Sequence, residues 1–390
     1  MLLDSKKREQ KILAWAYPGL WVFVTSFLWS PSRDGVEAVY ALAFFIPLLF
    51  VLPWRKPSLS VYGGIFTLLA LAYASWSVLS SFWGADGIFF TLQWVVLAVW
   101  LSGSSMLLQH KIASLEQLWG WLIFIGSFSA LVNIAVFYSN HPFAERLEGI
   151  TIARAPTLVG QIYGVVVLLA IVQSWRVDSF KLAFLLSIAA VPALIAVGLS
   201  QSRGPLFALV VALGVGLVWL KPWRKILALQ VAVSLLLLAF LLKFIPLSGI
   251  LIERGASFRD HLWGHLLQSM LAEPATFIWG VGMTQSTVIS TTVGEFHHAH
   301  NAWLEILYRT GLIGLFLAFA HLACLLWFAI KHLKWAILVL WLLYGYVCLF
   351  VDSRSLFWEI DAKWFMYWIP AGLLAAVLSA PDEQRQSVNK

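Results

Sequence analysis

The 390-residue chain has little charge and almost no cysteine. Charged residues make up 12% of it and hydrophobic residues 61%, which leaves too little polar surface to cover a water-soluble domain. The two cysteines, Cys324 and Cys348, fall near opposite ends of two predicted helices, so no disulfide framework is expected. The sequence also shows no internal repeat and no low-complexity segment. It therefore predicts a protein that crosses a membrane several times.

Long apolar runs predict twelve membrane-spanning helices and an all-α polytopic fold. A helix needs roughly 17 to 25 mostly apolar residues to cross about 30 Å of hydrocarbon. The basic N-terminus precedes the first run without a small-residue cleavage site, so we expect an uncleaved first span. The runs fall at approximately 12–29, 36–53, 61–82, 87–107, 118–138, 157–175, 182–200, 205–220, 225–246, 302–329, 335–351 and 364–380.

The basic residues predict an orientation with both termini in the cytoplasm. In that orientation 16 of the 26 lysines and arginines lie in inner segments, mostly short loops, as the positive-inside rule requires. Lysine dominates inside, whereas eight of the ten outer basic residues are arginine. The planar fork of arginine binds phosphate or carboxylate bidentately. As a set, the outer arginines favour an anionic ligand, although any one of them alone is equally compatible with snorkelling or local pairing.

Two predicted outer segments, 139–156 and 247–301, are long. These segments divide the chain into three predicted parts. Residues 1–246 form nine helices and contain the shorter outer segment, residues 247–301 form the longer outer loop, and residues 302–390 form three helices and an inner tail. Apolar and polar residues recur at helical spacing from Arg259 to Pro274, which predicts an amphipathic helix along the membrane surface. Gly280 and Gly282 predict a tight turn after it.

The sequence SQSRGPL at 200–206 places an arginine at the start of a helix. Pro205 suits the first helical turn, and Ser202 or a neighbour can cap it. Arg203 then lies beside unpaired backbone N–H groups, and this combination favours an anion. The alternative is an ordinary interfacial arginine.

Three histidines, His297, His298 and His300, precede the tenth predicted helix. They are close enough to share an ion, but a zinc site needs three or four ligands in a defined geometry. Only the carboxylate of Glu295 is near in sequence, and neighbouring histidines rarely converge on one ion. We therefore expect no metal.

His300 can instead act as a base. On a helix that starts near Asn301, it would lie at the outer end of a face along which glycines let another helix approach. An imidazole there can accept a proton near neutral pH, which fits a general base, while the alternative is a polar residue that caps the span. The other members of this predicted face are Leu304, Leu307, Gly311 and Gly314.

Arg309 has a different predicted role. It points away from His300, and Glu305 precedes it by four residues, the favourable order for an intrahelical ion pair. We expect a structural pair, because an unpaired charge at that depth is costly. The remaining ligand candidates on the outer face are Arg146, Arg154, Arg203, Arg254, Arg259 and Arg354.

Several of these segments resemble motifs of the bacterial O-antigen ligase and polymerase superfamily. The run from His300 and Asn301 through Leu304 to Gly311 and Gly314 is similar to its H-N-x-x-L-x6-G-x-x-G signature. Three further matches are SQSRG at 200–204, Arg259 and Trp263 followed by Gly280 and Gly282, and RLEG at 146–149. The N-P-N that commonly follows RLEG is absent here.

The resemblance implies a metal-independent glycosyltransferase of the GT-C type without a cofactor, at the periplasmic face of a bacterial inner membrane. Its donor would be a polysaccharide on undecaprenyl diphosphate and its acceptor a sugar hydroxyl of lipid A core. The third expected partner is membrane lipid. We expect no binding of nucleic acid, and we expect a monomer. The implied catalytic residues are His300, Arg203 and Arg259, and the implied substrate-binding residues are Arg254, Arg146, Arg154, Arg354, Asn301 and His298.

Four functions compete at this point. The chain length, the single dominant late outer loop and the terminal signature favour an O-antigen ligase over an O-antigen polymerase. Protein O-oligosaccharyltransferases often carry a large C-terminal outer domain, whereas this sequence ends after PDEQRQSVNK. A transporter or flippase would place charge near the bilayer midplane and show repeated halves, which the sequence does not.

Overall fold

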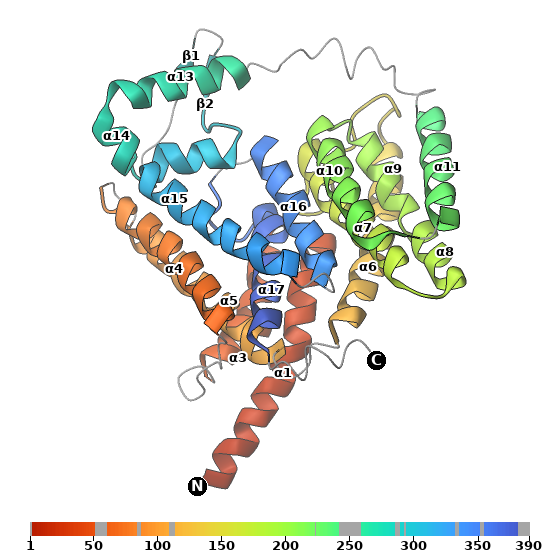
Figure 1. Cartoon of the computed structure of the whole chain (residues 1–390), viewed down its shortest axis with the longest axis horizontal. Helices are drawn as coiled ribbons and strands as arrows, with labels where there is room; N and C mark the ends of the chain where they lie inside the picture. Colours follow the sequence, from red (N-terminus) through yellow and green to blue (C-terminus); the bar gives the residue numbers. More distant parts are fainter. Residues whose placement is uncertain are drawn as a thin grey trace.

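A computed structural model shows a bundle of helices (Figure 1). It describes residues 2–50, 61–83, 87–108, 114–222, 224–241, 259–284, 289–291, 294–331, 335–351 and 355–380. The helices, with π-helical segments labelled η, are α1 (Leu2–Trp29), α2 (Arg33–Val39), η1 (Tyr40–Phe45), α3 (Ile46–Leu49), α4 (Val61–Ser81), α5 (Gly87–Leu108), α6 (Leu115–Tyr138), α7 (Pro156–Arg176), α8 (Phe180–Ala189), α9 (Val191–Leu199), α10 (Arg203–Leu220), α11 (Arg224–Leu241), α13 (Arg259–Ala272), α14 (Pro274–Trp279), α15 (Ala302–Lys331), α16 (Ala336–Val351), η4 (Trp364–Trp368) and α17 (Ile369–Ser379).

The protein is an all-α polytopic membrane protein. Each predicted span falls on one helix or on consecutive helices, as far as the structure describes it. Among the described residues, seven helices are long and apolar enough to cross a bilayer, and two shorter apolar helices, Ala336–Val351 and Trp364–Ser379, accompany them. These seven are Gly63–Ser81, Gly87–Leu108, Leu115–Tyr138, Pro156–Arg176, Phe180–Leu199, Arg203–Leu220 and Ala302–Trp327. The total of twelve crossings stays a prediction.

Prolines explain why two predicted spans contain a π-helical turn. Pro370 has no N–H that could bond to the carbonyl of Met366. The segment η4 ends at Trp368, two residues before this proline, and the N–H of Ile369 donates to the carbonyl of Trp364, five residues earlier. The carbonyl of Met366 faces Gly345 of α16 so closely that a Cβ at Gly345 would lie 2.0 Å from its oxygen. Only glycine allows that approach. The same arrangement recurs at η1 with Pro47, Ala43 and Gly19.

The helices form two groups with α16 between them. One group contains α4, α5, α15 and α17, and the other contains α6 to α11, in which α7 is buried along most of its length (Figure 1). Helix α16 packs against α10 and α7 on one side and against α15 and α17 on the other. Both groups therefore meet at α16.

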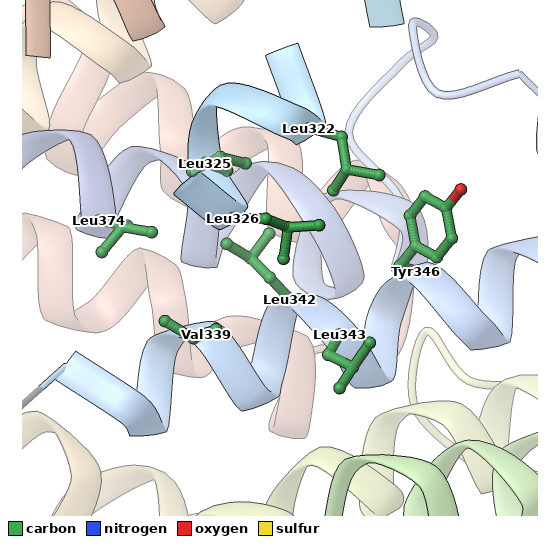
Figure 2. Close-up of a pocket in the computed structure, with 8 residues that line it drawn as sticks. All are labelled: Leu322, Leu325, Leu326, Val339, Leu342, Leu343, Tyr346 and Leu374. Carbon is green, nitrogen blue, oxygen red and sulfur yellow. The ribbon is translucent and has the colours of Figure 1, made fainter. Parts of the chain in front are cut away.

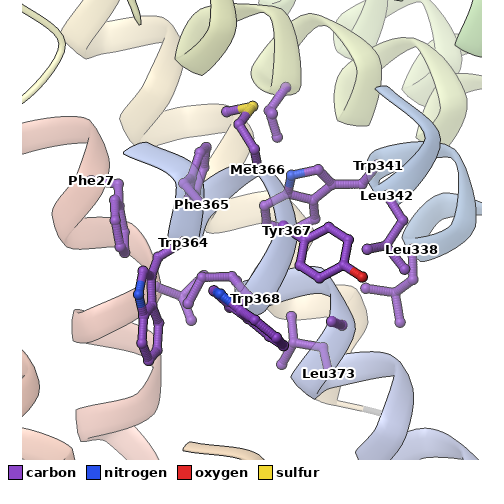
Figure 3. Close-up of a cluster of buried hydrophobic side chains, with 14 of the residues drawn as sticks. Phe27, Leu338, Trp341, Leu342, Trp364, Phe365, Met366, Tyr367, Trp368 and Leu373 are labelled. Atoms are coloured by element: carbon purple, nitrogen blue, oxygen red, sulfur yellow. The ribbon is translucent and has the colours of Figure 1, made fainter. Parts of the chain in front are cut away.

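A cavity and an aromatic core, both lined mainly by apolar side chains, lie beside α16. A cavity of about 160 Å³ lies between α15, α16 and α17, and apart from Tyr346 its lining is leucine and valine (Figure 2). Buried aromatic rings fill the core around η4, where Phe365 lies 5.3 Å from Phe27 and 5.1 Å from Trp341 between ring centroids (Figure 3). The lining of the cavity carries no charged group, and the titratable groups of the aromatic core, His321 and Tyr367, are buried and hydrogen-bonded to each other. The site must therefore be sought elsewhere.

The end of the molecule opposite the N-terminus, called the distal end below, carries the loop elements (Figure 1). Helix α13 begins at Arg259 and ends before Pro274, as the sequence predicts. Beside it lies a two-stranded antiparallel hairpin of β1 (Ile289–Thr291) and β2 (Gly294–Phe296), in which Ser290 pairs with Glu295. The sequence analysis did not predict this hairpin.

Helix α15 is broken at Gly311, where φ is 67° and ψ is −171°. Three carbonyls before the break accept hydrogen bonds from outside the helix: Tyr308 from Val281 N–H, Arg309 from Gly282 N–H, and Thr310 from the indole of Trp76. The predicted continuous helical face from His300 to Gly314 is therefore wrong. His300 lies before the helix, with φ at 52°, and Gly311 interrupts it. The predicted close approach at the glycines is confirmed.

We expect Gly311→Ala to unfold or destabilise the protein by about 3 kcal/mol or more. The new Cβ would lie 2.1 Å from the carbonyl oxygen of Ile278, on a backbone that side chains rarely adopt. The yield of monodisperse protein in detergent and its thermal midpoint measure this. Gly214→Ala is the control, because a Cβ there meets nothing within 4 Å. Equal stability of both variants would contradict the break at Gly311.

Candidate active site

The SQSRG segment forms a tight turn between α9 and α10. Gln201 has φ of 51°, and α10 begins at Arg203, whose side chain is exposed. Ser202 occupies the cap position, but its side chain does not cap the helix. The predicted start of the helix is confirmed, and the segment presents Arg203 at the N-terminus of α10, where backbone dipoles favour an anion.

Arg146 braces this turn. Its Nε donates to the carbonyl oxygen of Ser200 at 3.1 Å, and its Nη2 donates to Oγ of Ser202 at 3.0 Å. The neighbouring Leu147 N–H donates to the carbonyl of Leu199 at 2.9 Å. These contacts explain why Ser202 does not cap its helix. They also hold the segment 139–155, between α6 and α7, against the residues that carry Arg203.

Arg154, at the other end of the 139–155 segment, is tied to a different part of the molecule. It is exposed, and its Nη2 donates to the carbonyl of Pro31 at 3.4 Å. Nearby, the N–H of Ile152 donates to the carbonyl of Ser30 at 2.9 Å. The side chain of Arg154 thus contacts the residues that follow α1.

The histidine segment is fixed by bonds on both sides of Ala299. The indole N–H of Trp263 donates to the carbonyl of Ala299 at 2.9 Å, and the N–H of Ala299 donates to Oε2 of Glu305 at 2.8 Å. His300 follows in a left-handed conformation, and its N–H donates to Nδ1 of His298 at 3.1 Å, with the two ring centroids 3.9 Å apart. His298 and His300 therefore form one partly exposed unit.

Asn301 caps α15. Its Oδ1 accepts hydrogen bonds from the N–H groups of Trp303 at 3.0 Å and Leu304 at 3.1 Å, which is the preferred arrangement at a helix N-terminus. The side chain is 5% exposed. Asn301 thus directs the start of α15 immediately after His300.

Helix α13 docks on this segment. Its residues Leu262, Leu266 and Met270 are buried against Ala299 and Leu307. Arg259 opens α13 and lies one turn before Trp263, on the same side of the helix, because residues four apart share a face. The guanidinium of Arg259 is therefore carried on the side of α13 that binds the histidine segment.

The end of α16 brings these segments together. A Cβ on Gly204 would lie 2.9 Å from Cγ1 of Val351, so the turn that carries Arg203 contacts the last residue of α16. One residue earlier, the ring of Phe350 lies 6.1 Å from that of Trp263 on α13. Arg203, Arg259 and His300 thus belong to three segments that surround one helix end. The predicted ligands Arg254 and Arg354 lie outside the described residues.

Arg309 is paired as predicted and lies inside the protein. Its Nε contacts Oε1 of Glu305 at 2.5 Å, its Nη1 donates to the carbonyl of Met283 at 2.8 Å, and its guanidinium lies 5.5 Å from the ring centroid of Trp358. Both members of the ion pair are less than a tenth exposed. Arg309 therefore is not a surface cation for a ligand.

The segments that meet at the distal end carry both cations and an imidazole. Arg203 and Arg259 each stand at the start of a helix, and His300 lies in the histidine segment on which α13 docks. In the part of the chain that the structure describes, no three histidine, cysteine, aspartate or glutamate side chains are grouped as metal ligands would be. Both cysteines are free thiols in helices.

Comparison with known proteins matches the same segments. Residues 188–319 match the family model described as O-antigen ligase, a range that contains Arg203, Arg259 and His300. An O-antigen ligase of Pseudomonas aeruginosa is 26% identical over 379 residues, which cover 93% of this chain and 90% of that protein. Both matches support the O-antigen ligase family.

The apolar helices support a multi-pass membrane protein, and the similarity to an O-antigen ligase indicates a glycosyltransferase-like enzyme. Sequence reasoning missed two side chains of the site, Glu305 and Trp263, as partners of Ala299. No local pattern indicates either bond. The hairpin before the histidines did leave a signal, a β-branched run interrupted by glycine in ISTTVGEF at 289–296.

Proposed function

We propose that this protein transfers a polysaccharide from undecaprenyl diphosphate to a sugar hydroxyl of lipid A core. The observation that carries the proposal is the meeting of the Arg203 turn, α13 and the histidine segment at the end of α16. A transfer from a lipid diphosphate needs cations for the leaving group and a base for the acceptor, and this place offers both. The family and the P. aeruginosa relative support the ligase activity over the polymerase alternative.

His300 acts as the general base in this proposal. Its imidazole takes the proton of the acceptor hydroxyl, whose oxygen attacks the anomeric carbon on the side opposite the diphosphate. The bond from that carbon to the diphosphate oxygen breaks, the electron pair leaves with the diphosphate, and the anomeric configuration inverts. The imidazolium then loses its proton to water.

Arg203 and Arg259 bind the leaving group. Charge grows on the diphosphate oxygens as the glycosidic bond breaks, and guanidinium groups positioned there stabilise it more in the transition state than in the ground state. We assign Arg254 and Arg354 to the same leaving group, because in the sequence they lie five residues before the start of α13 and three residues after the end of α16. The scheme, of the GT-C type, needs no metal or cofactor. Further substrate contacts are assigned to Arg146, Arg154, Asn301 and His298.

The active site faces the periplasm, with both termini in the cytoplasm and the chain in the inner membrane. The distribution of lysine supports this orientation, because 16 of the 26 basic residues, most of them lysine, fall in segments that the sequence assigns to the inner side. The distal end, where α13 and the hairpin lie, is then the outer end (Figure 1). A lipid-linked donor reaches it from the outer leaflet.

Three bacterial strains test the function. One lacks its O-antigen ligase, one lacks its O-antigen polymerase, and one lacks the flippase for the lipid-linked saccharide. We expect the gene to restore full-length lipopolysaccharide, read on gels, in the first strain alone. Rescue of the second strain alone would establish a polymerase, and rescue of the third alone would establish a flippase; both results overturn the proposal.

A further inference from the structure

A buried ion pair contacts the backbone beside the proposed base. Glu305 is 1% exposed, and its two carboxylate oxygens have different partners: Oε1 pairs with Arg309 and Oε2 accepts the N–H of Ala299. A buried carboxylate is costly unless it is paired and hydrogen-bonded, and this one is both. Since neither oxygen faces solvent, Glu305 itself is not placed to take a proton from a substrate.

The two bonds to Ala299 fix both peptide groups that precede the imidazole. The N–H of Ala299 belongs to its peptide with His298, and the carbonyl of Ala299 belongs to its peptide with His300. Glu305 holds the first and the indole of Trp263 holds the second. These two side chains are called the Ala299 clamp. One comes from α15 and the other from α13, so the clamp also joins the two helices.

The backbone of His300 needs such support. Its φ of 52° is a left-handed conformation, which is unfavourable for a residue with a side chain and persists where the surroundings over-determine it. Arg309 fixes the position of the Glu305 carboxylate, because its Nε pairs with Glu305 while its Nη1 donates to the carbonyl of Met283. The direction of the imidazole thus depends on a chain of bonds that runs into the core.

We propose that Glu305 and Trp263 are positioning residues, which set the orientation of His300 through Ala299 without touching substrate. This inference rests on the proposed role of His300 as base. A misplacement of about 1 Å in a reacting group can lower a rate on the order of 100-fold. Loss of either clamp bond therefore lowers kcat, while donor binding, which depends on the arginines, stays as it is.

Glu305→Gln tests the first bond. Glutamine has one acceptor oxygen, so it cannot both receive the Ala299 N–H and face Arg309 as the carboxylate does. In purified full-length protein we expect kcat per donor-binding site to fall about 10- to 100-fold, with the Kd for lipid-linked saccharide unchanged within about twofold. Glu116→Gln is the matched control, since that carboxylate pairs with Arg176 near the N-terminal side of the bundle. It should keep wild-type kcat.

Trp263→Phe tests the second bond, because it removes the indole N–H together with the five-membered ring but keeps an aromatic ring at this position. We expect kcat to fall about tenfold at unchanged donor Kd. The matched control is Trp175→Phe, which removes an indole N–H bonded to Gln230. If both clamp variants keep wild-type kcat per binding site, or lose kcat and donor binding in parallel, the positioning role is overturned.

His300→Ala separates the two proposals. If it is inactive while Glu305→Gln and Trp263→Phe equal wild type, the clamp fails and the base stands. If His300→Ala itself equals wild type, the proposed base fails. In the His300→Ala background we expect Glu305→Gln to change the residual rate less than twofold, because a positioning residue has no effect once its target is gone. A further tenfold loss there would show a role independent of His300 and overturn the inference.

Discussion

His300→Ala protein is expected to fold and bind donor but to transfer sugar about 100- to 10,000-fold more slowly than wild type, the range that a lost general base accounts for. The side chain is partly exposed, and its contacts are with His298 and Phe296 at the edge of the histidine segment. Alanine there leaves the Ala299 clamp and the Asn301 cap in place. The measurement is single-turnover transfer from lipid-linked saccharide to lipid A core.

The control for this variant is His265→Ala. His265 is an exposed histidine of α13, so its removal should change transfer and stability little. A His300→Ala protein that transfers at the wild-type rate would exclude His300 as the base. A slow variant that also fails to bind donor would instead assign His300 to substrate binding.

Arg203→Ala is expected to lower kcat/KM for the donor about 100- to 1,000-fold, as seen when one preorganised group that stabilises developing negative charge is removed. Arg203→Lys should recover part of this loss, because an ammonium keeps the charge but lacks the bidentate fork. Stability should hardly change, since the side chain is exposed at the start of α10. Donor titrations at low and high salt measure the effect.

Arg224→Ala serves as the matched control for Arg203→Ala. Arg224 is likewise an exposed arginine that opens a helix, α11, but it lies on the N-terminal side of the bundle. We expect its activity to equal wild type. Equal losses in the two variants would mean that a general effect of charge, and not binding at the distal end, underlies the result.

Local features of the site were predictable from sequence because they depend on short spacings. The apolar runs determine the helices, and the four-residue spacing of Glu305 and Arg309 determines their pair. The start of α10 at Arg203 follows from its serine and proline neighbours. Each of these depends on residues within one or two helical turns of each other.

Features that depend on distant segments were not predictable in this way. The bonds from Arg146 to the turn at 200–202 join residues more than fifty positions apart, and the sequence offers only an outer arginine. From the sequence, Gly311 is interpreted as a small residue for helix packing. In the structure the helix breaks there, and the carbonyls of the three preceding residues accept hydrogen bonds from Trp76 of α4 and from residues 281 and 282. Tertiary contacts decide both.

The fate of the sugar in a purified system tests the central claim most directly. Wild-type protein in detergent is incubated with polysaccharide on undecaprenyl diphosphate and with lipid A core, and the products are analysed by mass and by the anomeric configuration of the new bond. We predict polysaccharide joined to the core with inversion, undecaprenyl diphosphate released, and both products formed about 100- to 10,000-fold more slowly by His300→Ala. A saccharide that grows on its carrier, or stays unchanged while the core remains bare, would contradict the account.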